Sequence, residues 1–115
     1  MSLDVCLYID VDTGGNELRR MYLFEANITH NLGEMAKEAG IYKQLWRPDE
    51  IEAKQAKDII KDVESGLKLM KSDRPRFEKF NPQHGWGSYG NFVLWVEEYL
   101  EACKADPESF IYVSR

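Results

Sequence analysis

The chain opens with a strict alternation of apolar and polar residues. The apolar positions are Leu3, Val5, Leu7, Ile9 and Val11. A period of two residues is typical of a β-strand that buries one face and exposes the other. The pattern therefore predicts a strand over residues 3–11.

A turn and a second extended segment follow this strand. Residues 12–16, Asp-Thr-Gly-Gly-Asn, are turn formers, and residues 17–26 are rich in aromatic and branched side chains. Together they predict an antiparallel hairpin. Asp10, Asp12 and the glycines resemble the start of a calcium-binding loop, but Met21 stands where such a loop needs its bidentate glutamate. We expect these carboxylates to face solvent.

Helical signals occupy the middle of the chain. A short helix is predicted over residues 32–39, with Thr29 as its cap and Gly40 as its left-handed end. A longer helix is predicted to begin near Pro48 and to run to about Lys71, because apolar residues recur every three or four positions. These residues are Ala56, Ile59, Ile60, Val63, Leu67 and Met70.

The C-terminal part predicts one more helix and a last strand. The helix follows the glycine-rich segment 84–90, ends by residues 105–107, and buries Phe92, Val93, Val96, Tyr99, Leu100 and Cys103. Phe110 to Val113 then predict a strand that returns to the hairpin. The expected fold is α+β: a three-stranded sheet with about three helices on one face, formed by residues 1–115 as one domain.

Composition and charge exclude several classes of function. Hydrophobic residues make up 43% and charged residues 30%, as in soluble globular proteins, and no apolar run is long enough to span a bilayer. The start lacks a secretory signal, so we expect a cytoplasmic protein without membrane association. A net charge of −5 argues against general nucleic-acid binding, which needs clustered Lys and Arg.

The cysteines and histidines predict neither a disulfide nor a metal site. Cys6 and Cys103 lie far apart in the sequence without partners at ligand spacing, which is typical of free thiols in a reducing compartment. His30 and His84 are also distant from each other and have no carboxylate motif. We expect no metal and no cofactor.

The segment His84-Gly-Trp-Gly-Ser-Tyr-Gly90 carries the most distinctive chemistry. Its glycines match the dinucleotide-binding pattern G-x-G-x-x-G, but no buried strand precedes them, and that strand is needed to place a pyrophosphate on the helix start. A structural turn is therefore favoured, with Trp86 and Tyr89 packed into the core. The segment can also form the wall of a pocket, and the two roles can hold together. His84, Ser88, Asn81 and Asn91 would supply the polar groups of that pocket.

A second polar cluster lies at Asn27-Ile-Thr-His-Asn31. One interpretation is that Asn27, Thr29, His30 and Asn31 supply caps and turn hydrogen bonds between a strand and a helix. The other is that they present directed donors and acceptors to a ligand. We predict that this corner and the 84–91 loop share one partly exposed pocket, where helix starts favour a small anion or carbonyl group.

Several short segments of the sequence, taken together, say more than the single motifs. They are Asn27-Ile-Thr-His-Asn-Leu-Gly, Tyr42-x-x-Leu-Trp-Arg-Pro48, Lys79-Phe-Asn-Pro, Gly85-Trp-Gly-x-Tyr89 and Val96-Glu-x-Tyr-Leu-x-Ala-Cys103. Together they resemble a family of small uncharacterised proteins of bacteria, bacteriophages and prophages. The resemblance implies a source and a single-domain size, and it supplies no catalytic residue.

Two functions compete on this basis. The favoured hypothesis is a small non-catalytic binding or interaction module, whose partner is a small polar ligand or another protein. The alternative is a small enzyme acting on a polar metabolite, with His30 or His84 as general acid or base. The first is favoured because no second group accompanies either histidine at a fixed spacing.

Overall fold

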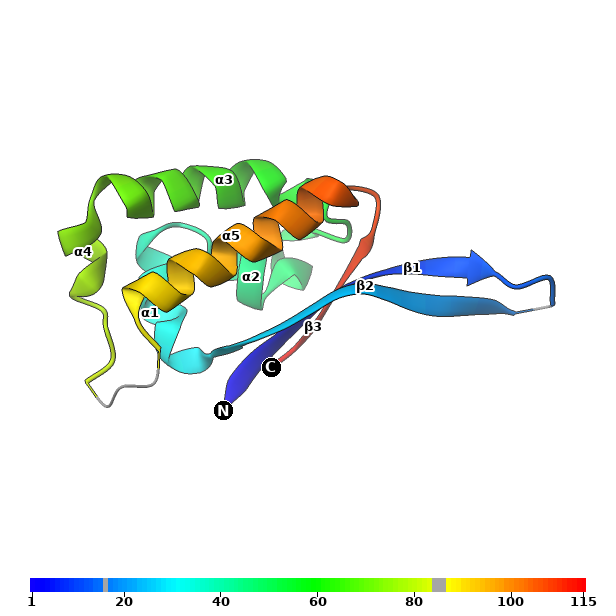
Figure 1. The fold of residues 1–115 in the computed structure, drawn as a ribbon, viewed down its shortest axis with the longest axis horizontal. Helices are drawn as coiled ribbons and strands as arrows, with labels where there is room; N and C mark the ends of the chain where they lie inside the picture. The colour runs from blue at the N-terminus through cyan, green and yellow to red at the C-terminus, as the bar shows by residue number, and fades with distance from the viewer. Residues whose placement is uncertain (16, 84–86) are drawn as a thin grey trace.

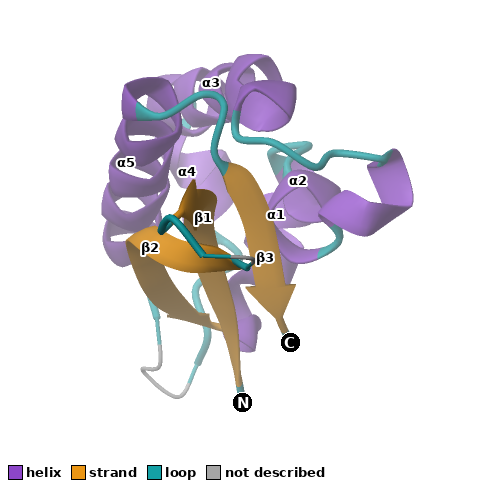
Figure 2. Cartoon of the chain, turned by 90° about the vertical axis from the view of Figure 1, so that its right-hand side faces the viewer, coloured by secondary structure: helices purple, strands orange, loops and turns teal. Residues whose placement is uncertain are grey.

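A computed structural model describes residues 1–15, 17–83 and 87–115 of the chain. One antiparallel sheet of three strands, in the order β2-β1-β3, carries the helices on one face (Figures 1 and 2). The predicted α+β architecture is confirmed.

The sheet is built on a long hairpin of β1, Ser2–Asp12, and β2, Leu18–Thr29. Leu3, Val5 and Leu7 are fully buried beneath the helices, as their alternation predicts. The second strand continues to Thr29, beyond the predicted end at residue 26, because Asn27 and Thr29 still pair with the start of β1. Asn27 therefore belongs to the sheet and not to a corner.

One irregularity interrupts the hairpin. Leu7 pairs with Phe24 and the next residue, Tyr8, pairs with Tyr22, so Leu23 is an extra residue on β2. Such a bulge reverses the face to which alternate side chains point. Even-numbered residues of β2 before the bulge therefore share a face with odd-numbered residues after it.

The last strand, β3, spans Phe110–Ser114 and pairs antiparallel with β1, which confirms its predicted return to the hairpin. Its other edge is partly covered, because the Ile111 N–H donates to the Lys54 carbonyl over 2.9 Å. Gln55 also forms an isolated bridge with Phe110.

Among the described residues the helical elements outnumber the three expected. The α-helices are α1 Gly33–Glu38, α2 Tyr42–Trp46, α3 Lys57–Ser72, α4 Arg74–Glu78 and α5 Tyr89–Ala105, and the 3-10 turns are His30–Leu32 and Pro48–Ile51. Gly40 follows α1 with a φ of +77°, in the left-handed conformation predicted for it.

The helix predicted to start at Pro48 is wrong in its first part. Pro48 begins only a 3-10 turn, which ends at Glu52 with a φ of +57°. The next residues run beside β3, where Lys54 and Gln55 bond to the strand, so α3 starts at Lys57. Proline and acidic residues suit the start of a 3-10 turn as well as that of an α-helix. Pairing with β3 holds Lys54 and Gln55 outside a helix, so only the 3-10 turn forms at Pro48.

The core lies between the sheet and the two long helices, α3 and α5. Val63 of α3 and Val96 of α5 are both buried, and Phe77, Phe92 and Tyr99 are its largest fully buried side chains. Two members of the predicted stripes, Ile60 and Val93, are only partly buried. Phe24 of β2 stacks on Tyr99, with ring centroids 5.9 Å apart, and so joins the sheet to α5.

The distal half of the hairpin projects beyond the helices (Figure 1). The molecule measures 53 × 27 × 23 Å along its principal axes, and this projection accounts for the long axis. We call the paired segments 8–12 and 18–23 the arm. Helices cover the sheet near the termini, while the arm extends from the helical layer into solvent.

Candidate functional site

The predicted corner makes several of its own hydrogen bonds. The Asn27 side-chain amide donates to Ser2 Oγ over 2.9 Å and to Asp4 Oδ1 over 2.7 Å, across the paired strands. Thr29 Oγ1 accepts from the Asn31 N–H over 3.3 Å and thereby caps the first 3-10 turn. These bonds hold Asn27 and Thr29 in structural roles, and Asn31 stays exposed.

His30 is held by an aromatic partner. Trp46 Nε1–H donates to His30 Nδ1 over 2.9 Å, so the hydrogen of the neutral imidazole lies on Nε2. Burial of Trp46 and its hydrogen bond fix the orientation of the ring. In this tautomer His30 offers a ligand an N–H donor and has no free ring nitrogen to accept a proton.

His30 borders two hollows on the surface. The first, of about 700 Å³, is lined by Met1, Ser2, Asn27, Thr29, His30 and Asn31, and so contains the predicted corner residues. The second, of about 420 Å³, shares Met1 and His30 with the first and extends over α1 and α2. The corner therefore borders open space as well as serving as a cap.

The end of the glycine-rich loop reaches this corner. Gly87 has a φ of +91°, and a Cβ placed on it would lie 2.8 Å from Thr29 Cγ2 and 3.0 Å from Leu32 Cδ1. Only glycine fits such a close approach in that conformation. His84 and Trp86, which the shared-pocket hypothesis needs, lie outside the described residues. The shared pocket stays a prediction.

The remaining loop residues build the start of α5. Ser88 Oγ caps the helix by accepting the Asn91 N–H over 3.2 Å. The Tyr89 N–H donates to Asn81 Oδ1 over 2.7 Å, and the buried Tyr89 hydroxyl donates to the Met70 carbonyl over 2.8 Å. Ser88, Tyr89 and Asn91 thus hold the loop and helix together, and they are not among the described residues that line the two hollows at His30.

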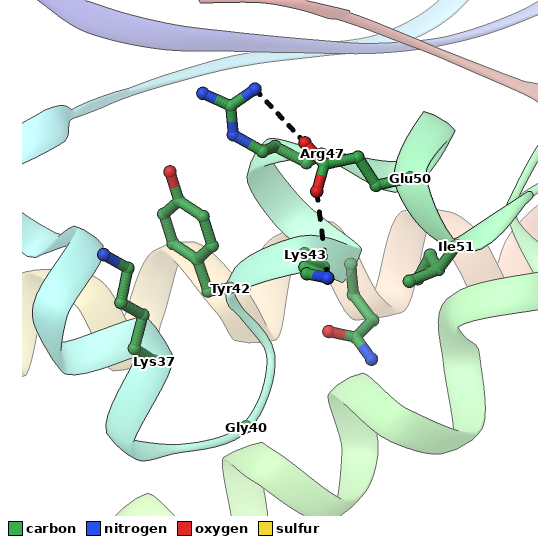
Figure 3. A pocket seen from close by; sticks show the side chains of 8 residues that line it. Lys37, Gly40, Tyr42, Lys43, Arg47, Glu50 and Ile51 are labelled. Carbon is green, nitrogen blue, oxygen red and sulfur yellow. Dashed lines mark hydrogen bonds and ion pairs between the residues drawn. The ribbon is translucent and has the colours of Figure 1, made fainter.

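Sequence reasoning missed a larger feature beside His30. The 420 Å³ hollow shares Lys37, Tyr42 and Arg47 with a third hollow of about 670 Å³. Figure 3 shows the side chains that line this third hollow. We call the two hollows together the Tyr42 groove. The side chains that line it include His30, Lys37, Tyr42, Lys43, Arg47 and Arg115.

Aromatic stacking gives the groove a firm wall. The rings of Tyr42 and Trp46, one helical turn apart on α2, stack with centroids 5.3 Å apart and planes 10° from parallel. Lys37 Nζ lies 4.8 Å from the Tyr42 ring centroid, a distance typical of a cation–π contact. Arg115, which directly follows β3, reaches the same wall and donates to the Trp46 carbonyl over 3.0 Å.

The groove is more positive than the molecule as a whole. Lysines and arginines at positions 37, 43, 47 and 115 line it, against the carboxylates of Glu34 and Glu50. Lys37 is paired with Glu34 over 3.1 Å, and Arg115 with Asp49 over 3.5 Å. Glu50 lies between two of the cations, 3.3 Å from Arg47 and 3.8 Å from Lys43 (Figure 3). A hydrogen bond with Tyr42, and to a smaller extent the charge of Glu50, raises the pKa of Arg47 above its ordinary value.

The groove presents several hydrogen-bond donors of one kind. Guanidinium and ammonium groups, with the His30 Nε2–H, supply donors for a carboxylate or a phosphate. The described residues contain no group of three or more His, Cys, Asp or Glu that could hold a metal ion. The thiols offer no alternative site: burial raises the pKa of Cys103 to about 12, and Cys6 and Cys103 are both free.

No protein-family model, curated protein or solved structure matches this chain. The resemblance to small bacterial and bacteriophage proteins therefore stays a prediction. Across residues 1–15, 17–83 and 87–115, no helix combines the length and apolar character needed to cross a membrane.

Proposed function

We propose that the protein is a small non-catalytic binding module that holds an anionic small molecule in the Tyr42 groove. The observation that carries this proposal is the accumulation of positive charge there. Four cationic side chains line the groove in a chain whose net charge is −5. Such a local reversal of sign attracts anions and repels cations.

The ligand would compete with Glu50 for its cations. Arg47 and Lys43 are half-exposed and share one carboxylate, so an incoming carboxylate or phosphate can replace Glu50 without leaving a buried charge unpaired. Arg115 and Lys37 approach from other elements and have exposed carboxylate partners of their own, Asp49 and Glu34, which the ligand would also have to replace. His30 adds a neutral donor. The bonds of Arg115 and His30 to Trp46 prearrange these groups before binding.

The geometry of His30 favours binding over catalysis. General acid–base catalysis needs a ring nitrogen that can exchange a proton with the substrate. Nδ1 of His30 is occupied by the Trp46 N–H, and Nε2 carries the hydrogen of the neutral ring. His30 is thus suited to orient an anion, and the small-enzyme alternative draws no support from it.

Calorimetric titration and thermal shift with pyrophosphate and citrate test the proposal. We expect at least one of the two probes to stabilise the protein, and Arg47→Gln to weaken that binding about tenfold, a loss of about 1.4 kcal/mol. Arg74→Gln is the matched control, because Arg74 forms a comparable exposed ion pair with Glu78 outside the groove. Its affinity for the probe should equal that of the parent protein.

The affinity should also fall as salt concentration rises, since exposed charges are screened. Absence of binding by both probes would refute an anion site. Equal loss of affinity in Arg47→Gln and Arg74→Gln would also refute the site, because a nonspecific charge effect weakens binding equally at both positions.

A further inference from the structure

The outer strand of the arm exposes an unusual amount of apolar surface. Every residue from Leu18 to Leu23 is exposed, although the segment belongs to β2. Its large apolar side chains are Leu18, Met21, Tyr22 and Leu23, with exposed fractions of 66%, 51%, 50% and 37%. β2 is also an edge strand of the sheet. A long apolar edge is a template for pairing with another strand.

The contacts of β3 show which backbone groups of β2 point outward from the edge of the sheet. The Ile111 N–H points away from β1, because it donates to Lys54. Backbone groups of an antiparallel strand alternate in direction, so Tyr112, opposite Cys6, points toward β1. Cys6 in turn points toward β3, and its other partner, Glu25, points its N–H and C=O away from the sheet.

The same alternation applies beyond the bulge. Ile9 of β1 points its backbone groups toward β2 and pairs with Met21. The neighbouring Arg20 therefore points its N–H and C=O outward, as Glu25 does. Both residues offer free backbone groups at the edge of the sheet.

The bulge also brings the side chains of Arg20 and Glu25 to one face. Arg20 Cζ lies 3.8 Å from the ring centroid of Tyr8, and Glu25 Oε1 lies 4.0 Å from Cys6 Sγ. Tyr8 and Cys6 belong to the face of β1 opposite the buried Leu7. Without the extra residue Leu23, two residues five positions apart would lie on opposite faces.

We propose that a second copy of this chain pairs with β2, strand to strand and antiparallel, about a two-fold axis between Tyr22 and Leu23. In this register Arg20 lies opposite the partner's Glu25, and Glu25 lies opposite the partner's Arg20. Charge complementarity at the shared edge thus selects a copy of the same chain. The contact is isologous, so each favourable pair forms twice.

The helical layer allows this register. Helix α5 covers β2 at Phe24, which stacks on Tyr99, and it leaves the arm bare. The two-fold axis places Phe24 opposite the partner's Met21, so that each arm passes below the helical layer of the other protomer. The two α5 helices are offset along the strands, and the exposed Met21 gains an apolar neighbour. The product is one continuous sheet of six strands.

Sedimentation and light scattering over a wide range of protein concentration test the proposal. We expect a species with twice the chain mass of 13.4 kDa. Arg20→Glu and Glu25→Arg should each weaken dimerisation at least about tenfold, because each places like charges opposite one another twice. The double variant carrying both changes should restore the dimer, because the complementary pairs form again with reversed polarity.

Two further variants distinguish this register from a dimer held by nonspecific charge or by another face. Arg19→Glu is the matched control: it makes the same charge change, but the backbone of Arg19 points toward Val11 of β1 and its side chain lies on the other face, so dimerisation should persist. Met21→Ser removes an exposed apolar group without adding charge and should weaken the dimer. Far-UV circular dichroism and melting verify that each variant is folded.

A purely monomeric parent protein overturns the proposal, as does a dimer that neither single charge reversal weakens. Failure of the folded double variant to restore dimerisation overturns the register. The test is independent of the Tyr42 groove, whose anion binding is measured separately.

Discussion

At the scale of single residues, close contacts decide where glycine is needed. Gly66 lies in the middle of α3, where glycine normally weakens a helix. A Cβ at this position would collide with Ile41 Cγ2 and lie 3.0 Å from the Ala39 carbonyl oxygen. The glycine therefore allows the turn between α1 and α2 to pack against α3. That turn also leads into the wall of the Tyr42 groove.

Gly66→Ala is expected to lower the free energy of unfolding by about 1–3 kcal/mol through overpacking, despite the better helix propensity of alanine. Gly90→Ala is the matched control, because Gly90 is also helical and has nothing within 4 Å of its Cβ position. It should leave stability unchanged or raise it. Urea unfolding of both variants checks the prediction, and an equally stable Gly66→Ala would contradict the contact with Ile41.

At the scale of elements, alternation and helical periodicity predicted the main layers. β1 was found because its period-two pattern is local, β2 and β3 because aromatic and branched residues gather in them, and α5 because its buried residues recur on one face. The bulge at Leu23 was not predictable, because it depends on how two strands pair and not on either strand alone. The predicted start of α3 was wrong for a similar reason, since contacts with β3 hold Lys54 and Gln55 outside the helix.

The helix faces themselves can be tested with two substitutions on α5. Val96→Asp should unfold the protein or cost it more than about 3 kcal/mol, because it places an unpaired charge at a fully buried position. Leu94→Asp makes the same kind of change on the same helix, where the side chain is 56% exposed, and should cost less than about 1 kcal/mol. Chemical denaturation distinguishes the two, and near-parental stability of Val96→Asp would disprove the proposed packing of α5.

At the scale of the whole molecule, the two candidate surfaces lie on different parts of the fold. The Tyr42 groove depends on Trp46 and Arg115, which are 69 residues apart in the sequence and meet only because β3 returns to the sheet. The spacing of Lys43 and Arg47, one helical turn apart, can be read from the sequence. The hollow beside them could not be predicted, because it is formed by the tertiary structure. The arm, in contrast, is local in sequence, and its exposed apolar residues become informative only once β2 is known to be an edge strand.

Shortening the arm tests whether the molecule consists of a self-sufficient core and a separable contact surface. Residues 10–20 would be replaced by Asn-Gly, which joins Ile9 to Met21 through a two-residue turn suited to a hydrogen-bonded pair. The core residues lie outside the deleted segment, so the variant should fold cooperatively. Because it lacks Arg20, it should be monomeric, and its melting temperature should not depend on protein concentration, whereas that of the parent dimer should rise with concentration. Differential scanning calorimetry at several concentrations measures both. A shortened variant that melts with the concentration dependence of the parent would place the dimer contact elsewhere on the molecule.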